Sequence, residues 1–82
     1  MAKPILLAED VKEDADAVRQ AVRTAGFDNP VYVVSDGDLA ISYLKGEGAY
    51  SNRELFPFPS ILLLDLNMPR VSGFEVLKWI KN

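Results

Sequence analysis

The sequence predicts an α/β fold in which helices cover both faces of a parallel sheet. Three short apolar runs without polar alternation are typical of strands buried on both faces of such a sheet; they are residues 4–9, 31–34 and 60–65. A segment with helical periodicity follows each run, so the expected order is βαβαβα. The sequence has no internal repeat and no low-complexity segment.

The first strand is expected over residues 4–9, which read Pro-Ile-Leu-Leu-Ala-Glu. After Asp10 the apolar residues recur with the period of a helix and share one face. These residues are Ala15, Val18, Ala21, Val22 and Ala25. Gly26 is expected to end this helix, because glycine adopts the left-handed conformation of a helix stop at low cost.

The second strand is expected over residues 31–34, where Val-Tyr-Val-Val stands between two turn segments. Asp36 after it is expected to be a turn and capping residue without a chemical role. A short helix should span residues 39–44. Residues 46–59 then form a loop, since glycines and prolines interrupt every regular pattern there. This loop is long for a compact domain, which favours a variable or functional segment.

The third strand is expected over residues 60–65, which read Ser-Ile-Leu-Leu-Leu-Asp. A loop over residues 66–71 is broken by Pro69. Ser72 and Glu75 stand three residues apart, as in a capping box at the start of a helix. The apolar residues of that last helix recur at helical spacing and are Phe74, Leu77 and Ile80.

Length and composition narrow the possible functions. A chain of 82 residues forms at most one domain, and its 49% apolar content excludes a disordered chain. A net charge of −3 makes nucleic acid and anionic membranes poor partners. The apolar run near the N-terminus is too short for a signal peptide or a membrane span, so a cytoplasmic protein is expected. Without cysteine or histidine, a metal would bind to oxygen ligands, as Mg²⁺ does.

Three carboxylates stand at strand ends. Glu9 and Asp10 end the first strand, and Asp65 ends the third. The carboxyl ends of parallel strands share one edge, so with strand order 2-1-3 these residues meet at a switch point where ligands bind. Two carboxylates ~4 Å apart repel by about 4 kcal/mol at an effective dielectric of 20, and a divalent cation is the simplest remedy. Asp10 alone is better explained as a helix cap, but the three acids together favour a metal site.

The successive motifs of the chain resemble those of bacterial response-regulator receiver domains of two-component signalling. They lie at residues 5–10, 34–40 and 61–69 and at Ser72-Gly73. The resemblance covers nearly the whole chain and implies a flavodoxin-like, three-layer fold with the strand order 2-1-3. Pro69 and Gly73 would shape the loop after the third strand. The long loop over residues 46–59 resembles that of single-domain regulators paired with phytochrome-like kinases.

The resemblance also implies a role for each acidic residue. Asp65 would accept a phosphoryl group from the phosphohistidine of a sensor kinase or of a phosphotransfer protein, in a phosphorelay. Asp10 and Asp65 would bind Mg²⁺ directly, Glu9 through water, and Asn67 through its backbone carbonyl. The chain would be a phosphoacceptor, and its catalysis would be limited to its own phosphorylation and dephosphorylation.

Receiver domains have five strands and this chain has three, so residues 1–82 are expected to be the N-terminal part of a single receiver domain. The remainder would supply a serine or threonine, a lysine and the face that partners contact, and we expect impaired phosphorylation and switching without them. The third strand would present a bare apolar edge. We therefore expect a homodimer in which this strand pairs antiparallel with its copy.

Other functions are weighed against this one. A chemically silent half-domain that self-associates is the main alternative, and the absence of the lysine supports it. A phosphatase of the haloacid-dehalogenase type is rejected, because that motif needs a second aspartate where Asn67 stands. P-loop and dinucleotide-binding folds are excluded, because no glycine-rich loop follows Ala8.

Overall fold

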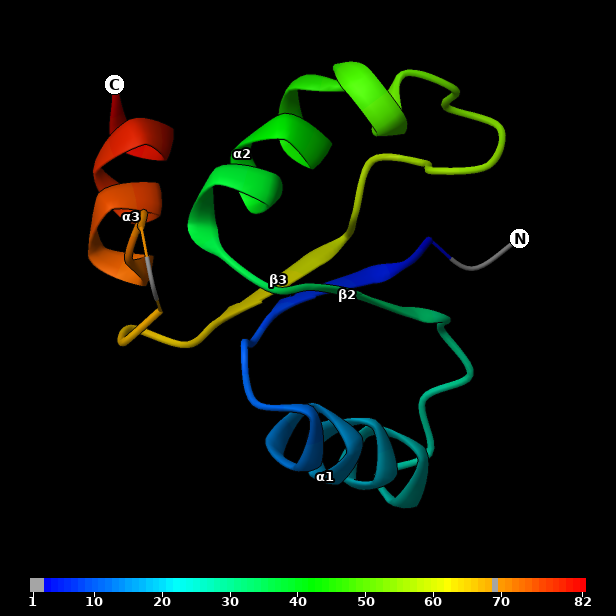
Figure 1. The fold of residues 1–82 in the computed structure, drawn as a ribbon. Helices are drawn as coiled ribbons and strands as arrows, with labels where there is room; N and C mark the ends of the chain where they lie inside the picture. Colours follow the sequence, from blue (N-terminus) through cyan, green and yellow to red (C-terminus); the bar gives the residue numbers. More distant parts are fainter. Residues whose placement is uncertain (1–2, 69) are drawn as a thin grey trace.

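The computed structural model of the chain describes residues 3–68 and 70–82, and its elements follow the expected βαβαβα order (Figure 1). The strands are β1 (Ile5–Ala8), β2 (Val31–Val34) and β3 (Ile61–Leu64). The helices are α1 (Lys12–Thr24), α2 (Gly37–Lys45) and α3 (Gly73–Lys81), with a short 3-10 helix η1 (Gly48–Tyr50) inside the expected loop. Within the described part of the chain, no helix is long and apolar enough to cross a membrane.

The sheet is parallel and has the order β2-β1-β3, as predicted. Its register pairs Ile5 of β1 with Val31 on one side and with Ile61 on the other. Figure 1 shows α1 below the sheet and α2 and α3 above it, so helices cover both faces. The predicted flavodoxin-like α/β arrangement of three layers is therefore confirmed.

The central strand β1 separates two apolar clusters, because its successive side chains point to opposite faces of the sheet. Ile5 and Leu7 pack against α1, in a cluster that also contains Ala15 and Val31. On the other face the buried residues come from the sheet, α2, α3 and the loop after β3; they are Leu6, Ala8, Val34, Ala40, Tyr43, Met68 and Val76. All four residues of β1 are buried, which fixes this strand in the centre of the fold.

The strand β3 is less buried than its sequence predicts. An apolar run of this kind is expected to be buried on both faces, but Leu62 to Leu64 are only half-buried and Ile61 is 39% exposed. The reason is that β3 pairs with β1 on one side and, among the described residues, with no strand on the other. Helix α3 likewise buries only Gly73 and Val76, and its exposed apolar residues include Phe74, Leu77 and Ile80.

The ends of the helices follow the predicted signals. Gly26 has a φ of 91°, and its N–H and that of Phe27 donate to the carbonyls of Arg23 and Val22, which closes α1. The capping box at the start of α3 is present in both directions. Helix α2 begins at Gly37, two residues earlier than expected, because the Asp36 carboxylate accepts a hydrogen bond from Leu39 N–H and caps the first turn.

Residues 46–59 form a compact cap rather than an open loop. Four aromatic rings pack together there with centroid distances of 5.1 to 6.2 Å; they belong to Tyr32, Tyr43, Tyr50 and Phe56. Arg53 holds the cap to α2, because its guanidinium donates to the carbonyl oxygens of Leu44 at 2.9 Å and of Phe56 at 3.1 Å.

Candidate metal site

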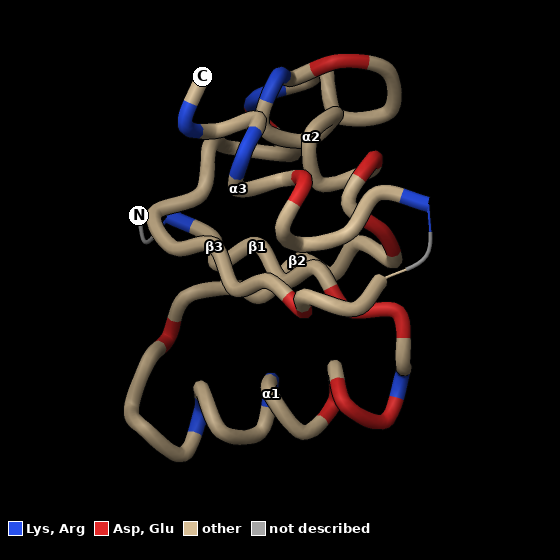
Figure 2. The backbone as a smooth tube through the Cα atoms, turned by 90° about the vertical axis from the view of Figure 1, so that its left-hand side faces the viewer, with Lys and Arg blue, Asp and Glu red and all other residues tan. Residues whose placement is uncertain are grey.

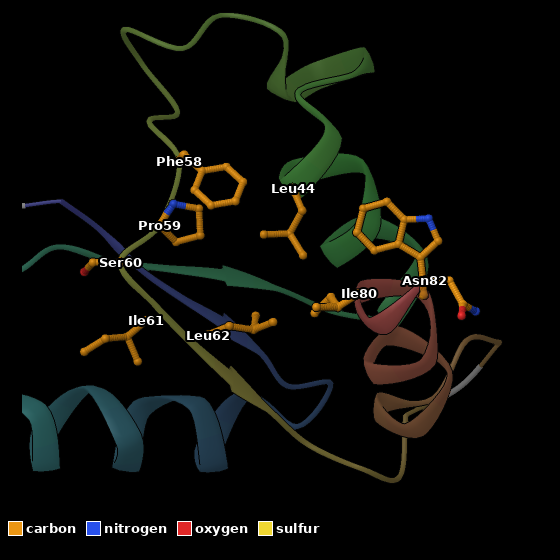
Figure 3. A pocket seen from close by; sticks show the side chains of 9 residues that line it. Leu44, Phe58, Pro59, Ser60, Ile61, Leu62, Ile80 and Asn82 are labelled. Carbon is orange, nitrogen blue, oxygen red and sulfur yellow. The ribbon is translucent and has the colours of Figure 1, made fainter.

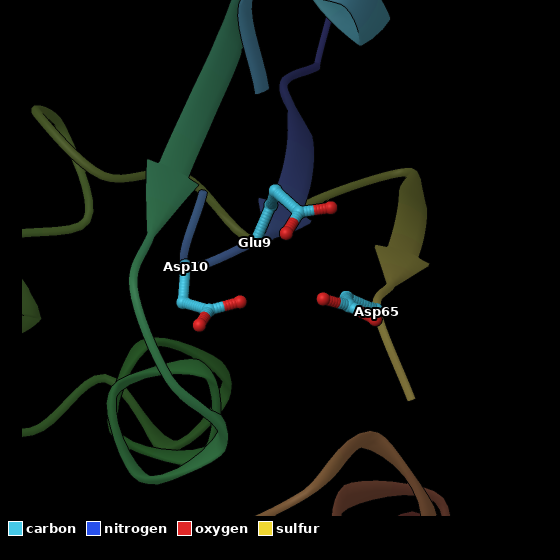
Figure 4. A group of neighbouring side chains, drawn as sticks. All are labelled: Glu9, Asp10 and Asp65. Carbon is cyan, nitrogen blue, oxygen red and sulfur yellow. The ribbon is translucent and has the colours of Figure 1, made fainter. Parts of the chain in front are cut away.

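Three carboxylates lie together where β1 and β3 end (Figure 4). Glu9, Asp10 and Asp65 each offer one oxygen, and these oxygens lie within 4.8 Å of one another. The strand register brings them together, because Ala8 pairs with Leu64 and Asp65 N–H donates to the Ala8 carbonyl at 2.9 Å. Residues that directly follow the two strands must therefore emerge side by side at this edge.

Backbone N–H groups orient two of these acids. Val11 N–H donates to Glu9 Oε2 at 3.3 Å, and Asn67 N–H donates to Asp65 Oδ1 at 3.0 Å. The helix-capping role considered for Asp10 is not found, since Val11 occupies the N-cap position and no side chain caps α1. The Asp10 carboxylate instead faces the other two acids in Figure 4.

The electrostatics of the cluster favour a cation. The hydrogen bond from Asn67 N–H holds the pKa of the Asp65 carboxyl below its usual value, which favours its charged form. Partial burial raises the pKa of Glu9; the hydrogen bond from Val11 opposes this, and the adjacent Asp65 carboxylate raises it further. Burial and the negative charge of Asp65 both disfavour the charged form of Glu9. A bound cation would offset both effects, because it attracts the two carboxylates. Oxygen ligands alone fit a hard divalent ion.

The surroundings of the cluster are charged as well. Figure 2 looks onto the side of the molecule where the strands end, and it shows acidic residues from several segments with basic residues among them. A hollow of about 310 Å³ lies beside the cluster and is lined by Glu9, Asp10 and residues of α1 that include Lys12. The Lys12 ammonium pairs with Asp16 at 3.0 Å, one turn along the helix.

The loop after β3 is anchored at both ends. Asn67 is exposed on this loop, and Met68 next to it is buried in the core. Gly73 packs so closely that a Cβ atom there would overlap the backbone oxygen of Asp65 and lie 2.9 Å from Leu66 Cα. The expectation that Gly73 shapes this loop therefore has a steric basis. Pro69, which was expected to act with it, lies outside the described residues.

One contact of the loop after β3 is not predicted by the sequence. Arg70 donates from Nη2 to Asp36 Oδ2 at 2.9 Å and lies 3.6 Å from Asp38 Oδ2. Asp36 is thus the expected capping residue and also the partner of a loop residue 34 positions away. No local pattern signals such a pair, because its two members belong to different motifs.

The comparisons with known proteins agree with the resemblance seen in the sequence. No protein-family model matches the chain. The chain is 40% identical over 79 residues to "Response regulator Rcp1" of Synechocystis sp. (strain ATCC 27184 / PCC 6803 / Kazusa), covering 96% of this chain and 52% of that protein. The chain spans about half the length of the curated relatives it matches.

Solved structures of phytochrome response regulators have the same fold. The bacteriophytochrome response regulator AtBRR superposes with a TM-score of 0.88 at 40% identity, over 99% of this chain and 57% of that one. The phosphorylated cyanobacterial phytochrome response regulator RcpA superposes with a TM-score of 0.85 at 40% identity, over 99% of this chain and 56% of that one. The Mn²⁺-bound form of response regulator Rcp1 superposes with a TM-score of 0.82 at 40% identity, over 96% of this chain and 55% of that one. The similarity thus includes proteins solved with a phosphoryl group and with a divalent metal.

Proposed function

Because the chain belongs to the response-regulator receiver family in sequence and in fold, we propose that it is a signalling module that accepts a phosphoryl group on Asp65. The observation that carries this proposal is the group of three carboxylates within 4.8 Å at the ends of β1 and β3. Since the chain spans about half the length of its relatives, we propose that residues 1–82 are the N-terminal part of a single receiver domain.

Each acid has a separate part in this proposal. Asp10 and Asp65 would hold Mg²⁺ directly, Glu9 would hold it through water, and Asn67 would contribute its backbone carbonyl. When bound, the metal would supply positive charge that offsets the charge of the incoming phosphoryl group. The Asp65 carboxylate, whose charged form the Asn67 N–H stabilises, is the nucleophile. The existence of a Mn²⁺-bound Rcp1 at 40% identity supports a divalent ion at this site.

The donor in this proposal is a phosphohistidine on a sensor kinase or on a phosphotransfer protein. Its phosphorus–nitrogen bond breaks as a phosphorus–oxygen bond to Asp65 forms, and the imidazole keeps the electron pair and takes up a proton. The chain is then a phosphoacceptor of the cytoplasm rather than an enzyme with its own substrate. Similarity to response regulators of phytochromes supports a phytochrome-type kinase as the donor.

Phosphorylation by a small donor tests the proposal directly. With acetyl phosphate and Mg²⁺, intact-mass spectrometry should detect one phosphoryl adduct, which Asp65→Asn abolishes. Asp28→Asn is the matched control, because Asp28 is an exposed acid far from the cluster in the sequence. We expect a slow reaction, because Lys45, Lys78 and Lys81 lie on α2 and α3, and the ammonium of Lys12, beside the cluster, is paired with Asp16. An adduct that persists in Asp65→Asn contradicts the assignment.

Metal binding is tested separately. Mn²⁺ should broaden the amide signals near Glu9, Asp10 and Asp65, and the affinity should be weak because Asp10 is exposed and Glu9 and Asp65 are only partly buried. Asp10→Ala and Asp65→Asn should each reduce the affinity about tenfold or more, as loss of a ligand group does at metal sites. Asp28→Asn should leave it unchanged. Equal Mn²⁺ affinity in all four proteins would remove the metal site from the proposal.

The open edge of β3 supports a second candidate, a chemically silent structural dimer. Ile61 and Leu62 on this edge help to line an apolar hollow of about 520 Å³, together with side chains of α3 that include Trp79 and Ile80. Figure 3 shows this hollow between the start of β3, α2 and α3. We propose that β3 pairs antiparallel with β3 of a second copy, in a sheet ordered 2-1-3-3′-1′-2′. This pairing would cover part of the exposed apolar surface.

Sedimentation equilibrium distinguishes the possibilities. A dimer should appear at micromolar concentration, and its thermal stability should rise with protein concentration, because folding and association are coupled. A folded monomer with concentration-independent stability contradicts the dimer. A dimer that gives no phosphoryl adduct supports the chemically silent structural dimer. A dimer that is phosphorylated on Asp65 is both a phosphoacceptor and a self-associating protein.

A further inference from the structure

The loop that follows Asp65 is tied to the start of α2, and we propose that the Arg70–Asp36 ion pair positions this loop for the metal. The inference rests on the proposed function, because it takes Asn67 on this loop as a metal ligand. Arg70 and Asp36 are then positioning residues, since they act through the loop and bind neither metal nor phosphoryl group themselves.

Asp36 is a fixed point for this contact. Its side chain is only 11% exposed, and both of its oxygens are engaged. Oδ1 accepts from Leu39 N–H at 2.9 Å, and Oδ2 accepts from Arg70 Nη2 at 2.9 Å. The carboxylate cannot rotate without uncapping α2. The Arg70 side chain is 63% exposed, and its ion pair with Asp36 fixes its guanidinium at the N-terminus of α2.

A second contact places the same stretch of loop. Gly37 N–H donates to the Val71 carbonyl at 2.9 Å. A Cβ atom on Gly37 would overlap that carbonyl oxygen and lie 2.8 Å from Val76 Cγ2, so the first turn of α2 and the loop pack without spare room. Arg70 and Val71 are thus held against α2 by one ion pair and one backbone hydrogen bond.

Asn67 lies between two anchored points. On one side Asp65 is bound to β1 through its N–H, and on the other Arg70 is bound to α2. Arg70 has a φ of 62°, a left-handed conformation that is unfavourable for a residue with a Cβ atom. Such a conformation persists when contacts hold it, and the ion pair with Asp36 is a contact of this kind.

Electrostatics and positioning predict opposite effects of removing Arg70. Loss of a positive charge near an acidic cluster should strengthen the binding of a cation. Loss of a positioning contact should weaken it, because the loop then samples conformations in which its carbonyl is displaced. The sign of the change in Mn²⁺ affinity therefore separates the two roles.

The experiment compares the Mn²⁺ dissociation constants of variants by water-proton relaxation, with circular dichroism confirming that each is folded. Arg70→Gln should weaken binding about three- to tenfold, at the low end of what partners of metal ligands contribute. Arg70→Gly should do the same, and it keeps the left-handed backbone without strain. Asp36→Asn retains the helix cap but loses the negative charge that pairs with Arg70. Added to Arg70→Gln in a double variant, it should change the Mn²⁺ dissociation constant little further, because the ion pair is already lost.

Lys45→Gln is the matched control, because it removes an exposed ion pair, Lys45–Glu47 at 2.8 Å, away from the cluster. Its Mn²⁺ affinity should equal that of the parent. Unchanged or tighter binding in both Arg70 variants would overturn the positioning role. A parent protein that does not bind Mn²⁺, or that binds it equally well after Asp65→Asn, would instead overturn the proposed function. The two failures are therefore distinguishable.

Discussion

The strands β2 and β3 are both edge strands of the described sheet, but the chain covers only one of them. Val31 and Val34 at the two ends of β2 are buried, whereas no residue of β3 is. Both strands are short apolar runs, so their own composition does not explain the difference. The difference arises from what packs beside each strand, which shows that an edge is closed by its neighbours in space.

At β2 the neighbour is the cap formed by residues 46–59. Tyr32 of β2 donates from its hydroxyl to the Leu55 carbonyl at 3.3 Å, and its ring lies 6.2 Å from that of Tyr43. Tyr43 is fully buried, and its hydroxyl donates to the Pro57 carbonyl at 2.8 Å. The guanidinium of Arg53 lies over the Tyr43 ring at 5.8 Å. Aromatic packing and side-chain hydrogen bonds thus cover the face of β2 toward α2, and Val31 is buried in the α1 cluster on the other face.

At β3 apolar hollows take the place of such a cap. Ile61 helps to line two of them, one of about 520 Å³ toward α3 and one of about 310 Å³ toward α1. Phe27 and Val22 lie at the second hollow. Among the described residues, nothing comparable to the aromatic cluster covers this edge. We therefore expect the two edges to respond differently to substitution.

The largest expected effect is on the closed edge. Tyr43→Ala should lower the free energy of unfolding by about 4 kcal/mol, because it removes a fully buried aromatic side chain and leaves a cavity. Ile61→Ala should cost only about 1 kcal/mol, because Ile61 is partly exposed and its site opens to solvent. Urea denaturation of both variants at one protein concentration measures the two losses. Equal losses would mean that Ile61 is as well covered as Tyr43.

Alkaline pH should weaken the closed edge by a smaller amount. Burial raises the pKa of Tyr43 to about 12 from its ordinary value of 10.0, so folding favours the neutral phenol. This contribution to stability is fully present below the unfolded pKa and is lost as pH rises through the folded one. The free energy of unfolding should fall by about 2 kcal/mol across this window. Denaturant unfolding at a series of pH values measures the fall.

Tyr43→Phe is the control for this titration. It loses the hydrogen bond to the Pro57 carbonyl and should therefore be less stable at neutral pH. Its stability should decline less than that of the parent over the same alkaline window, because the group with the raised pKa is gone. The same slope in both proteins would place the titrating group elsewhere.

The sequence was sufficient for the fold and for the expectation of clustered acids, because both depend on local periods and on strand ends. The apolar runs predict the strands, the resemblance to receiver domains supplies their order, and the residues that follow the strands mark the edge at which Glu9 and Asp65 emerge. The exposure of β3 was not predictable, because an apolar run predicts a buried strand but does not identify the segment that covers it. The pair Arg70–Asp36 was missed for a related reason, since it joins loops that only tertiary packing brings together.

The smallest expected effect on the folded chain is also the most informative about the open edge. A lysine on an edge strand opposes pairing with another chain, because its charge cannot be buried in a joined sheet. Ile61→Lys should change the free energy of unfolding of the dilute protein by only about 1 kcal/mol, because position 61 is partly exposed, yet it should abolish association. Leu55→Lys is the matched control, since it adds the same charge to an exposed apolar position beside β2. Sedimentation of both variants over a range of concentrations gives the comparison. If Leu55→Lys dissociates the protein as well, the effect is one of net charge, and if Ile61→Lys still associates, the copies meet through a surface other than β3.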